Sequence, residues 1–144
     1  ACGAHALIYG STRDHTLEVK TLLSDGSEAV FGPINKQQFE EKCKADSLEG
    51  TVYRKIKEIL SSEETQEEIR RQYPDPALRR RNNGYALDLL MNTDPFVNNE
   101  KVFNFSKLLA GSEGTLALTT EIKLNLEPLP PEHQALLCVH LETV

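Results

Sequence analysis

The sequence predicts an α+β fold in which an antiparallel sheet is flanked by helices. Apolar and polar residues alternate, as in half-buried strands, along residues 17–31 and again along residues 116–126. Between these regions, residues 35–73 are highly charged, and their apolar residues recur with a helical period. Strands followed by a block of helices are typical of an α+β domain.

The first 31 residues predict a short element followed by a β-hairpin. Residues 5–10, HALIYG, fit a short helix or a strand, and the small residues before them suit a helix start that faces a ligand. The pair Asp25-Gly26 is a strong turn signal, after which residues 28–31 return as the second strand. One face of the first hairpin strand carries Leu17, Val19, Thr21 and Leu23.

Three helices are expected between residues 35 and 75. Asn35 is a suitable N-cap for a helix that ends near Ala45, and Ser61 with Glu64 matches a capping box for the third helix. Because so many charges cannot be buried cheaply, we expect the whole segment to be peripheral and dispensable for the sheet. The second helix has an apolar stripe formed by Leu48, Val52, Ile56 and Leu60.

The last strand follows a short helix and a glycine turn. Residues 103–110 predict the helix, and Gly111 stands where a left-handed residue closes it. The proline cluster at residues 128–131 ends the strand, because proline has no N–H for a sheet ladder. We expect the even-numbered apolar residues to face the core against the hairpin: Leu116, Leu118, Ile122, Leu124 and Leu126.

An arginine-rich turn precedes this region. Arg79, Arg80 and Arg81 come directly before the turn signal at residues 82–84. Two interpretations remain open: a clamp for a phosphate or carboxylate, since guanidinium forks match both, and a surface turn. After it, we expect a short buried element with Tyr85, Leu87, Leu89 and Leu90.

Composition restricts the classes of function. The chain has 144 residues, a net charge of −6, 39% hydrophobic residues and 26% charged residues, which is the profile of a soluble globular protein. The negative charge argues against a nucleic-acid partner. No apolar run is long enough to span a membrane, and no signal peptide is visible.

The cysteines and histidines predict no metal site. The cysteines are odd in number, widely separated and without a Cys-x-x-Cys motif, so we expect free thiols in a reducing, cytoplasmic compartment. The histidines lack metal-ligand spacing such as His-x-x-x-His. These residues are Cys2, Cys43, Cys138, His5, His15, His133 and His140.

The turn Gly-Ser-Glu-Gly at residues 111–114 is a candidate ligand contact. Its two glycines would let backbone N–H groups approach a flat or anionic ligand closely, although the motif alone favours a tight connection with nothing bound. A phosphate-transfer enzyme is disfavoured, because the chain has no P-loop lysine. The residues alone leave open a non-catalytic α+β binding module whose helical segment, residues 35–75, docks a partner.

Three stretches taken together resemble one family. They are ACGAHALIYGSTRDHTLEVKTLLSDG at residues 1–26, RRRNNGYALDLL at residues 79–90 and FSKLLAGSEGTLALTTEIKLNLEPLP at residues 105–130. Their order and spacing are similar to motifs of the FAD-linked oxidases of the vanillyl-alcohol-oxidase type. That family includes D-lactate dehydrogenases, the glycolate oxidase flavin subunit and D-2-hydroxyglutarate dehydrogenases. The match rests on residues 1–34 and 79–131.

The resemblance implies an architecture in which FAD lies between two α+β lobes. Residues 1–131 match the second lobe, with residues 35–75 similar to a helical insertion of one long bacterial branch. Residues 132–144 match the start of the substrate-binding cap. The family's first lobe and most of its cap lie outside this sequence, and both ends of the chain look cut, so we expect a segment of a longer protein that supplies them.

The resemblance also implies FAD as the cofactor and a 2-hydroxy acid as the substrate, with hydride transfer from the α-carbon to flavin N5. No residue of this chain is assigned as a catalytic base or a metal ligand, and none of the arginines at 79–81 is assigned a role. We expect the isolated chain to carry little or no FAD and to be inactive.

Two turns match family segments that lie against FAD. Cys2 stands where serine is common, and Ala117 stands where glycine is usual, which narrows the space beside the flavin. The residues that match the two turns are Ala1, Cys2, Gly3 and Ala4, and then Gly111, Ser112, Glu113, Gly114, Thr115 and Leu116.

Overall fold

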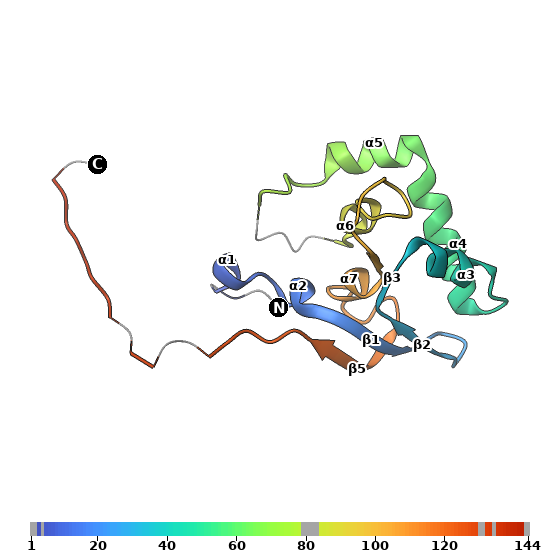
Figure 1. The fold of residues 1–144 in the computed structure, drawn as a ribbon, viewed down its shortest axis with the longest axis horizontal. Coiled ribbons are helices and arrows are strands. Elements are labelled where there is room, and N and C mark those ends of the chain that lie inside the picture. Colours follow the sequence, from blue (N-terminus) through green and yellow to red (C-terminus); the bar gives the residue numbers. More distant parts are fainter. Residues whose placement is uncertain (1–2, 4, 79–83, 130–131, 134, 143–144) are drawn as a thin grey trace.

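A computed structural model describes residues 3, 5–78, 84–129, 132–133 and 135–142, and it has the predicted α+β composition. Helices pack over one side of a small antiparallel sheet, and the described residues after β5 extend away from the rest of the chain (Figure 1). The elements are α1 (Ala6–Tyr9), α2 (Thr12–His15), β1 (Thr16–Leu22), β2 (Glu28–Phe31), β3 (Pro33–Ile34), α3 (Lys36–Lys44), α4 (Leu48–Ser61), α5 (Glu63–Gln72), α6 (Leu87–Met91), β4 (Phe103–Asn104), α7 (Ser106–Leu109) and β5 (Leu118–Leu124).

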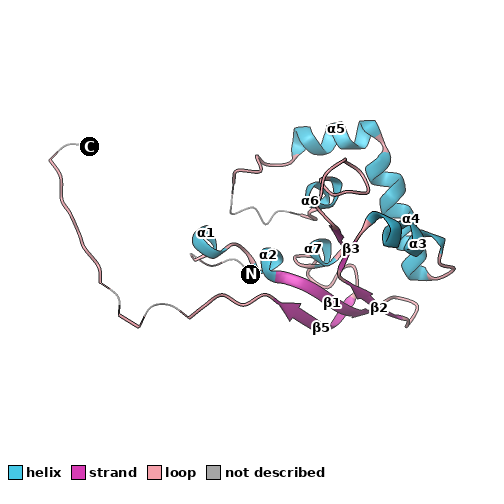
Figure 2. Ribbon diagram, in the orientation of Figure 1, coloured by secondary structure: helices cyan, strands magenta, loops and turns pink. Residues whose placement is uncertain are grey.

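The predicted hairpin is present as β1 and β2. β1 pairs antiparallel with β2 on one edge and with β5 on the other, so the strand order is β2-β1-β5, and β3 pairs separately with β4 (Figure 2). Val19, Thr21 and Leu23 are buried as expected. Leu17 is exposed, because a bulge between Thr16 and Glu18 in the ladder with β5 turns Thr16 inward instead.

The predicted burial of the last strand is wrong. Every residue of β5 is exposed, and Ile122, which was expected to face the core, is 57% exposed. Ala117, which was expected to face outward, packs against the core. The expected inward residues that are exposed are Leu116, Leu118, Ile122, Leu124 and Leu126.

A β-bulge and the position of the strand explain this result. Ile122 lies opposite Val19, which faces the core, whereas Leu118 lies opposite Leu22 on the other face. Thr120, left unpaired between Glu121 and Thr119, shifts the alternation by one residue. β5 is also an edge strand, and the core lies against β2 and the end of β1.

The three helices predicted between residues 35 and 75 are present as α3, α4 and α5. The Asn35 side chain caps α3 by accepting a 2.9 Å hydrogen bond from the Gln38 amide. The N-cap of α5 is Ser62 rather than the predicted Ser61, which is the last residue of α4. In the predicted stripe of α4, Ile56 and Leu60 are buried, and Leu48 and Val52 pack against the core.

The helical segment is not peripheral, which corrects the prediction made from its charge. Phe39 is 0% exposed and Tyr53 is 1% exposed. The Phe39 ring lies 4.8 Å from that of Phe103, and the Tyr53 ring lies 5.5 Å from that of Phe105, as measured between centroids. The charges occupy the outer helix faces, so the inner faces of α3 and α4 supply the aromatic centre of the core.

The short elements agree with the sequence in part. Residues 103–110 form β4 and then α7 rather than one helix, and residues 87–91 form α6. Leu90 is buried and Leu87 is partly buried, but Tyr85 is exposed. Residues 135–142, matched to the start of a cap domain, form no strand. The division of the chain into lobe, insertion and cap remains a prediction.

Candidate cofactor-binding site

The glycine turn at residues 111–116 begins where α7 ends. Its backbone has positive φ angles of 104° at Gly111, 53° at Glu113 and 77° at Gly114. The Thr115 amide donates a 3.0 Å hydrogen bond to the Ser112 carbonyl, which closes the turn. Ser112 is buried, whereas the other turn residues are exposed. The sequence therefore builds a tight, outward-facing loop from two glycines and one left-handed glutamate.

Three backbone amides in the outer part of this turn, residues 113–116, are available to a ligand. Within the described residues, the amides of Glu113, Gly114 and Leu116 donate no hydrogen bond to the protein. A Cβ placed at Gly114 would meet nothing within 4 Å, so an approaching molecule can reach the backbone there. Clustered amide donors of this kind match carbonyl or phosphate oxygens.

Gly111 lacks a side chain for a different reason. A Cβ at this position would lie 2.7 Å from Nη2 of Arg13. Arg13 is 9% exposed, and its Nε donates a 3.0 Å hydrogen bond to the Ala110 carbonyl. The positive φ angle therefore favours glycine here whether or not a ligand binds, and the nearby Arg13 guanidinium adds to that preference.

Lys107 makes the reciprocal contact from α7 to the start of β1. Its ammonium donates hydrogen bonds of 3.0, 2.9 and 2.8 Å to the carbonyls of Arg13, Asp14 and Thr16. Burial lowers the pKa of Lys107 below its ordinary value, and the nearby Asp14 carboxylate opposes that shift. Arg13 and Lys107 together fasten the residues between α2 and β1 to the helix that carries the glycine turn.

A second set of hydrogen bonds joins this turn to α5. The Tyr73 hydroxyl, at the C-terminal end of α5, donates a 2.8 Å hydrogen bond to the Tyr85 carbonyl. The Tyr85 hydroxyl lies 2.8 Å from Oγ1 of Thr115, which in turn donates to the Ser112 carbonyl. The turn is therefore connected to the helical segment as well as to the sheet.

The first predicted turn lies mostly outside the described residues, which omit Ala1, Cys2 and Ala4. Gly3 is described and exposed, and it lines a pocket of 430 Å³ between α1, α2 and the end of β5. No residue of the turn at 111–116 lines that pocket. The described residues therefore do not bring the two predicted cofactor turns into one pocket.

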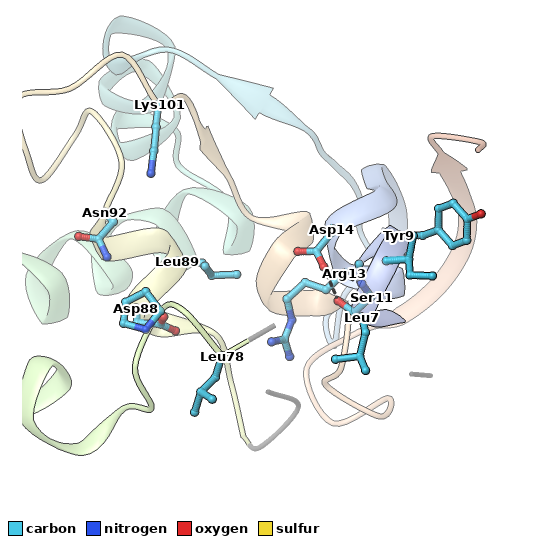
Figure 3. Close-up of a pocket in the computed structure, with 13 residues that line it drawn as sticks. Leu7, Tyr9, Ser11, Arg13, Asp14, Leu78, Asp88, Leu89, Asn92 and Lys101 are labelled. Atoms are coloured by element: carbon cyan, nitrogen blue, oxygen red, sulfur yellow. Dashed lines mark hydrogen bonds between the residues drawn. The ribbon is translucent and has the colours of Figure 1, made fainter. Parts of the chain in front are cut away.

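A cavity of 610 Å³ lies between the N-terminal helices and α6 (Figure 3). Arg13 lines it from α2 and Lys101 from the loop before β4, and Asp14 and Asp88 line it as well. Because the two cationic side chains and the two carboxylates balance in charge, the cavity favours neither an anionic nor a cationic ligand. The predicted arginine clamp at residues 79–81 lies outside the described residues.

The described residues contain no cluster of His, Cys, Asp and Glu suited to a metal ion. Cys43 is buried, and this burial raises the pKa of its thiol; Cys138 is exposed and free, and Cys2 is not described. None of the described helices has the length and apolar character needed to cross a membrane.

Sequence reasoning missed Arg13, Lys107 and Tyr85 as residues that position the turn. Each stands inside a stretch that resembles the flavoprotein family, which was the one available signal. Arg13 contacts a carbonyl 97 residues away, and Tyr85 contacts a hydroxyl 30 residues away. Such contacts arise from tertiary packing, and no local pattern encodes them.

No protein-family model matches this chain, and no solved structure matches it. Curated relatives do match. The chain is 36% identical over 130 residues to a D-2-hydroxyglutarate dehydrogenase of Pseudomonas putida, 31% over 130 residues to one of Pantoea ananatis, and 30% over 132 residues to one of Escherichia coli. Each match covers 90% of this chain.

The chain spans 12% of the length of these relatives. The similarity extends over nearly the whole chain, including the helical segment and the glycine turn, because 90% of its residues take part. The chain is therefore a distant homologue of one segment of the D-2-hydroxyglutarate dehydrogenases.

Proposed function

We propose that this chain forms part of an FAD-dependent oxidoreductase that oxidises a 2-hydroxy acid, and that it contributes one wall of the flavin site. The observation that carries the proposal is its homology to a segment of D-2-hydroxyglutarate dehydrogenases over 90% of its length. The resemblance of the three motif stretches to FAD-linked oxidases supplies the cofactor. The free thiol of Cys43 agrees with a cytoplasmic location, which we also propose.

The turn at residues 111–116 fits this role. The exposed amides of Glu113, Gly114 and Leu116 have no acceptor within the described residues, so they are free to donate to oxygens of the cofactor. The Glu113 carboxylate would repel a phosphate, which favours the flavin ring carbonyls over the pyrophosphate as the group held there. Gly3 and its neighbours at residues 1–4 are proposed as the second contact.

Bound FAD supplies the hydride acceptor for oxidation at the α-carbon of the hydroxy acid. The chain's own contribution is to bind and orient that group. The backbone amides at 113, 114 and 116 are fixed by the closed turn, and Arg13, Lys107 and Tyr85 hold the turn against the domain. We assign no proton transfer to a residue of this chain.

One wall is insufficient to retain a cofactor. A cofactor pocket buries most of its ligand, and the amide donors at 113, 114 and 116 face outward from a single exposed turn. Each loss of about 1.4 kcal/mol in contacts weakens binding roughly tenfold. We therefore propose that the isolated chain binds FAD weakly and oxidises no substrate by itself.

A chimera tests the proposal. The aligned segment of the Pseudomonas putida dehydrogenase would be replaced by the corresponding 130 residues of this chain, and the flavin absorbance and oxidation of D-2-hydroxyglutarate would be measured. We expect a yellow, active chimera. A chimera that folds but is colourless and inactive, beside an active parent, would refute the proposal.

A matched glycine pair locates the contact within that chimera. Gly114 has φ 77° and Gly26 has φ 83°, and a Cβ at either position would meet nothing within 4 Å. Gly114→Ala and Gly26→Ala therefore impose similar backbone strain. We expect Gly114→Ala to weaken flavin retention and Gly26→Ala to leave it unchanged. Equal effects would show that the turn at 111–116 does not contact the flavin.

A further inference from the structure

We propose that the free edge of β5 is a dimer interface, where β5 of a second copy of this chain pairs antiparallel with it about a two-fold axis at Ile122. The result would be one continuous sheet in the order β2-β1-β5-β5-β1-β2. This inference does not depend on the proposed flavin function, because it rests on the edge strand and its charge pattern alone.

The edge of β5 is open among the described residues. β5 is the last strand of its sheet, with β1 on one side and no described strand on the other (Figure 2). All of its residues are exposed, from Leu118 to Leu124. An exposed edge presents a row of backbone donors and acceptors that an added strand can satisfy.

The outer face of the sheet already carries alternating charges. In the ladder between β1 and β5, Lys20 lies opposite Glu121, and Glu18 lies opposite Lys123. The Lys20 ammonium is 3.6 Å from the Glu121 carboxylate. Opposite charges on facing residues stabilise antiparallel pairing, whereas like charges weaken it.

These charges select one register for self-pairing. Facing residues of two antiparallel strands must lie on the same face, so the two-fold axis passes through a residue rather than between residues. An axis at Ile122 places Glu121 of each copy opposite Lys123 of the other. An axis at Glu121 faces two carboxylates, and an axis at Lys123 faces two ammonium groups, so slips by one residue are disfavoured.

The same register joins apolar side chains on the inner face. Ile122 is 57% exposed and lies opposite the buried Val19, so its side chain is on the core side of the sheet. In the dimer the two Ile122 side chains face each other directly. Leu124, which is 42% exposed, flanks them in each copy. The pairing therefore covers apolar surface that the monomer leaves in water.

Self-complementarity is the reason to choose a second copy as the occupant. When two copies of the segment Glu121-Ile122-Lys123 pair antiparallel, the glutamate of each faces the lysine of the other. One sequence therefore supplies both halves of the interface. A strand from a different polypeptide would need its own matching charges. If the purified chain is monomeric, a strand from a different polypeptide becomes the favoured occupant of this edge.

Sedimentation equilibrium at low salt on the purified chain tests the interface. We expect a dimer whose dissociation constant rises at least about tenfold in Glu121→Lys and in Lys123→Glu, because each reversal creates two like-charge contacts. The double variant Glu121→Lys/Lys123→Glu restores opposite charges across the axis, and we expect it to dimerise like the wild type.

Glu28→Lys is the matched control. Glu28 also pairs with Lys20, at 3.2 Å, but it lies on β2 at the other edge of the sheet. It therefore reports the cost of losing a Lys20 partner without touching the interface, and we expect the dimer to persist. A monomeric wild type, or a dimer unaffected by both single reversals, would overturn the proposal. Loss of the dimer in Glu28→Lys to the same extent would also overturn it.

Discussion

Helices α3 and α4 bury their large apolar side chains, whereas strand β5 leaves its apolar side chains exposed. The helices are dense in charge, yet Phe39 and Tyr53 lie at the centre of the core. The strand alternates regularly, yet Ile122 and Leu124 remain in water. The helices pack against the aromatic residues of β4 and the loop after it, whereas no comparable layer of described residues covers β5.

This difference shows what amphipathic periodicity measures. A periodic pattern identifies which face of an element is apolar, but burial requires a second element to cover that face. In α3 and α4 the inner face buries one large aromatic side chain each, Phe39 and Tyr53. In β5 the bulge leaves Ile122 and Leu124 on the core side of the sheet, but the strand is at the sheet edge. Mean charge is therefore a poor guide to position in the fold.

The most severe test of the comparison is deletion of the helical segment. Replacing residues 36–72 by a short Gly-Ser linker removes Phe39, Tyr53 and Leu60, which form much of the core. We expect the remaining chain to lose cooperative unfolding in urea, as followed by circular dichroism. A deletion variant that still unfolds in one sharp transition would show that the sheet has a core of its own.

Single truncations on the two sides sharpen the contrast. Phe39→Ala should destabilise the protein by about 3–5 kcal/mol, because it opens a cavity among packed rings. Leu124→Ala should cost less than about 1 kcal/mol, since its side chain is already partly in water. Urea unfolding measured below the concentration of self-association gives both values. Similar losses for the two variants would contradict the comparison.

The fold was predictable wherever a local signal determined the structure. The Asp25-Gly26 hairpin, the Asn35 cap and the α4 stripe follow from short-range hydrogen bonding and helical spacing, and all three are present. The bulge at Thr120 and the burial of Phe39 depend on which neighbours pack against each element. Those neighbours are distant in sequence, so periodicity alone could not identify them.

The candidate site divides in the same way. The positive φ angles of Gly111 and Gly114 were foreseeable from the glycines themselves. The contact of Gly111 with the Arg13 guanidinium was not, because packing of α2 on α7 brings that side chain there. One glycine of the motif is thus explained by the fold, and Gly114 remains the more informative position for a ligand.

Unfolding at alkaline pH tests the buried helical region through Tyr53 of α4. Burial raises the pKa of Tyr53 well above its ordinary value of 10, with the Glu49 charge adding to the shift. Because the folded-state pKa exceeds the unfolded one, this stabilisation is complete below pH 10 and is lost as pH rises above it. The loss is at most about 1.4 kcal/mol per pH unit.

Tyr53→Phe isolates that contribution. We expect it to abolish the loss above pH 10 while it preserves the aromatic packing near neutral pH. Lys107 works in the opposite direction, because its pKa is lowered, so its deprotonation adds stability as pH rises toward 10.5. Equilibrium unfolding between neutral pH and pH 11 compares the variants. If Tyr53→Phe loses as much stability above pH 10 as the wild type, groups other than Tyr53 cause that loss.

The smallest expected effect concerns the connection between the two regions. The Tyr85 hydroxyl contacts Thr115 just before β5, and the Tyr85 carbonyl accepts from Tyr73 at the end of α5. Tyr85→Phe removes the hydroxyl contact and keeps the ring and the carbonyl. Because both side chains are exposed, water replaces the lost partner, and we expect a destabilisation of at most about 1 kcal/mol.

The local consequence of Tyr85→Phe should exceed the global one. Without the tyrosine hydroxyl, Ser112 is the one described residue that holds Thr115, so the turn opens more often and its amide exchanges faster with solvent. Hydrogen exchange at Thr115 measures this directly, with the exchange of β1 as the internal reference. Tyr9→Phe is the control, because Tyr9 is exposed and its hydroxyl has no hydrogen bond within the described residues. Faster exchange at Thr115 in Tyr85→Phe alone would establish that the helical segment restrains the turn through Tyr85, and equal exchange in both variants would exclude it.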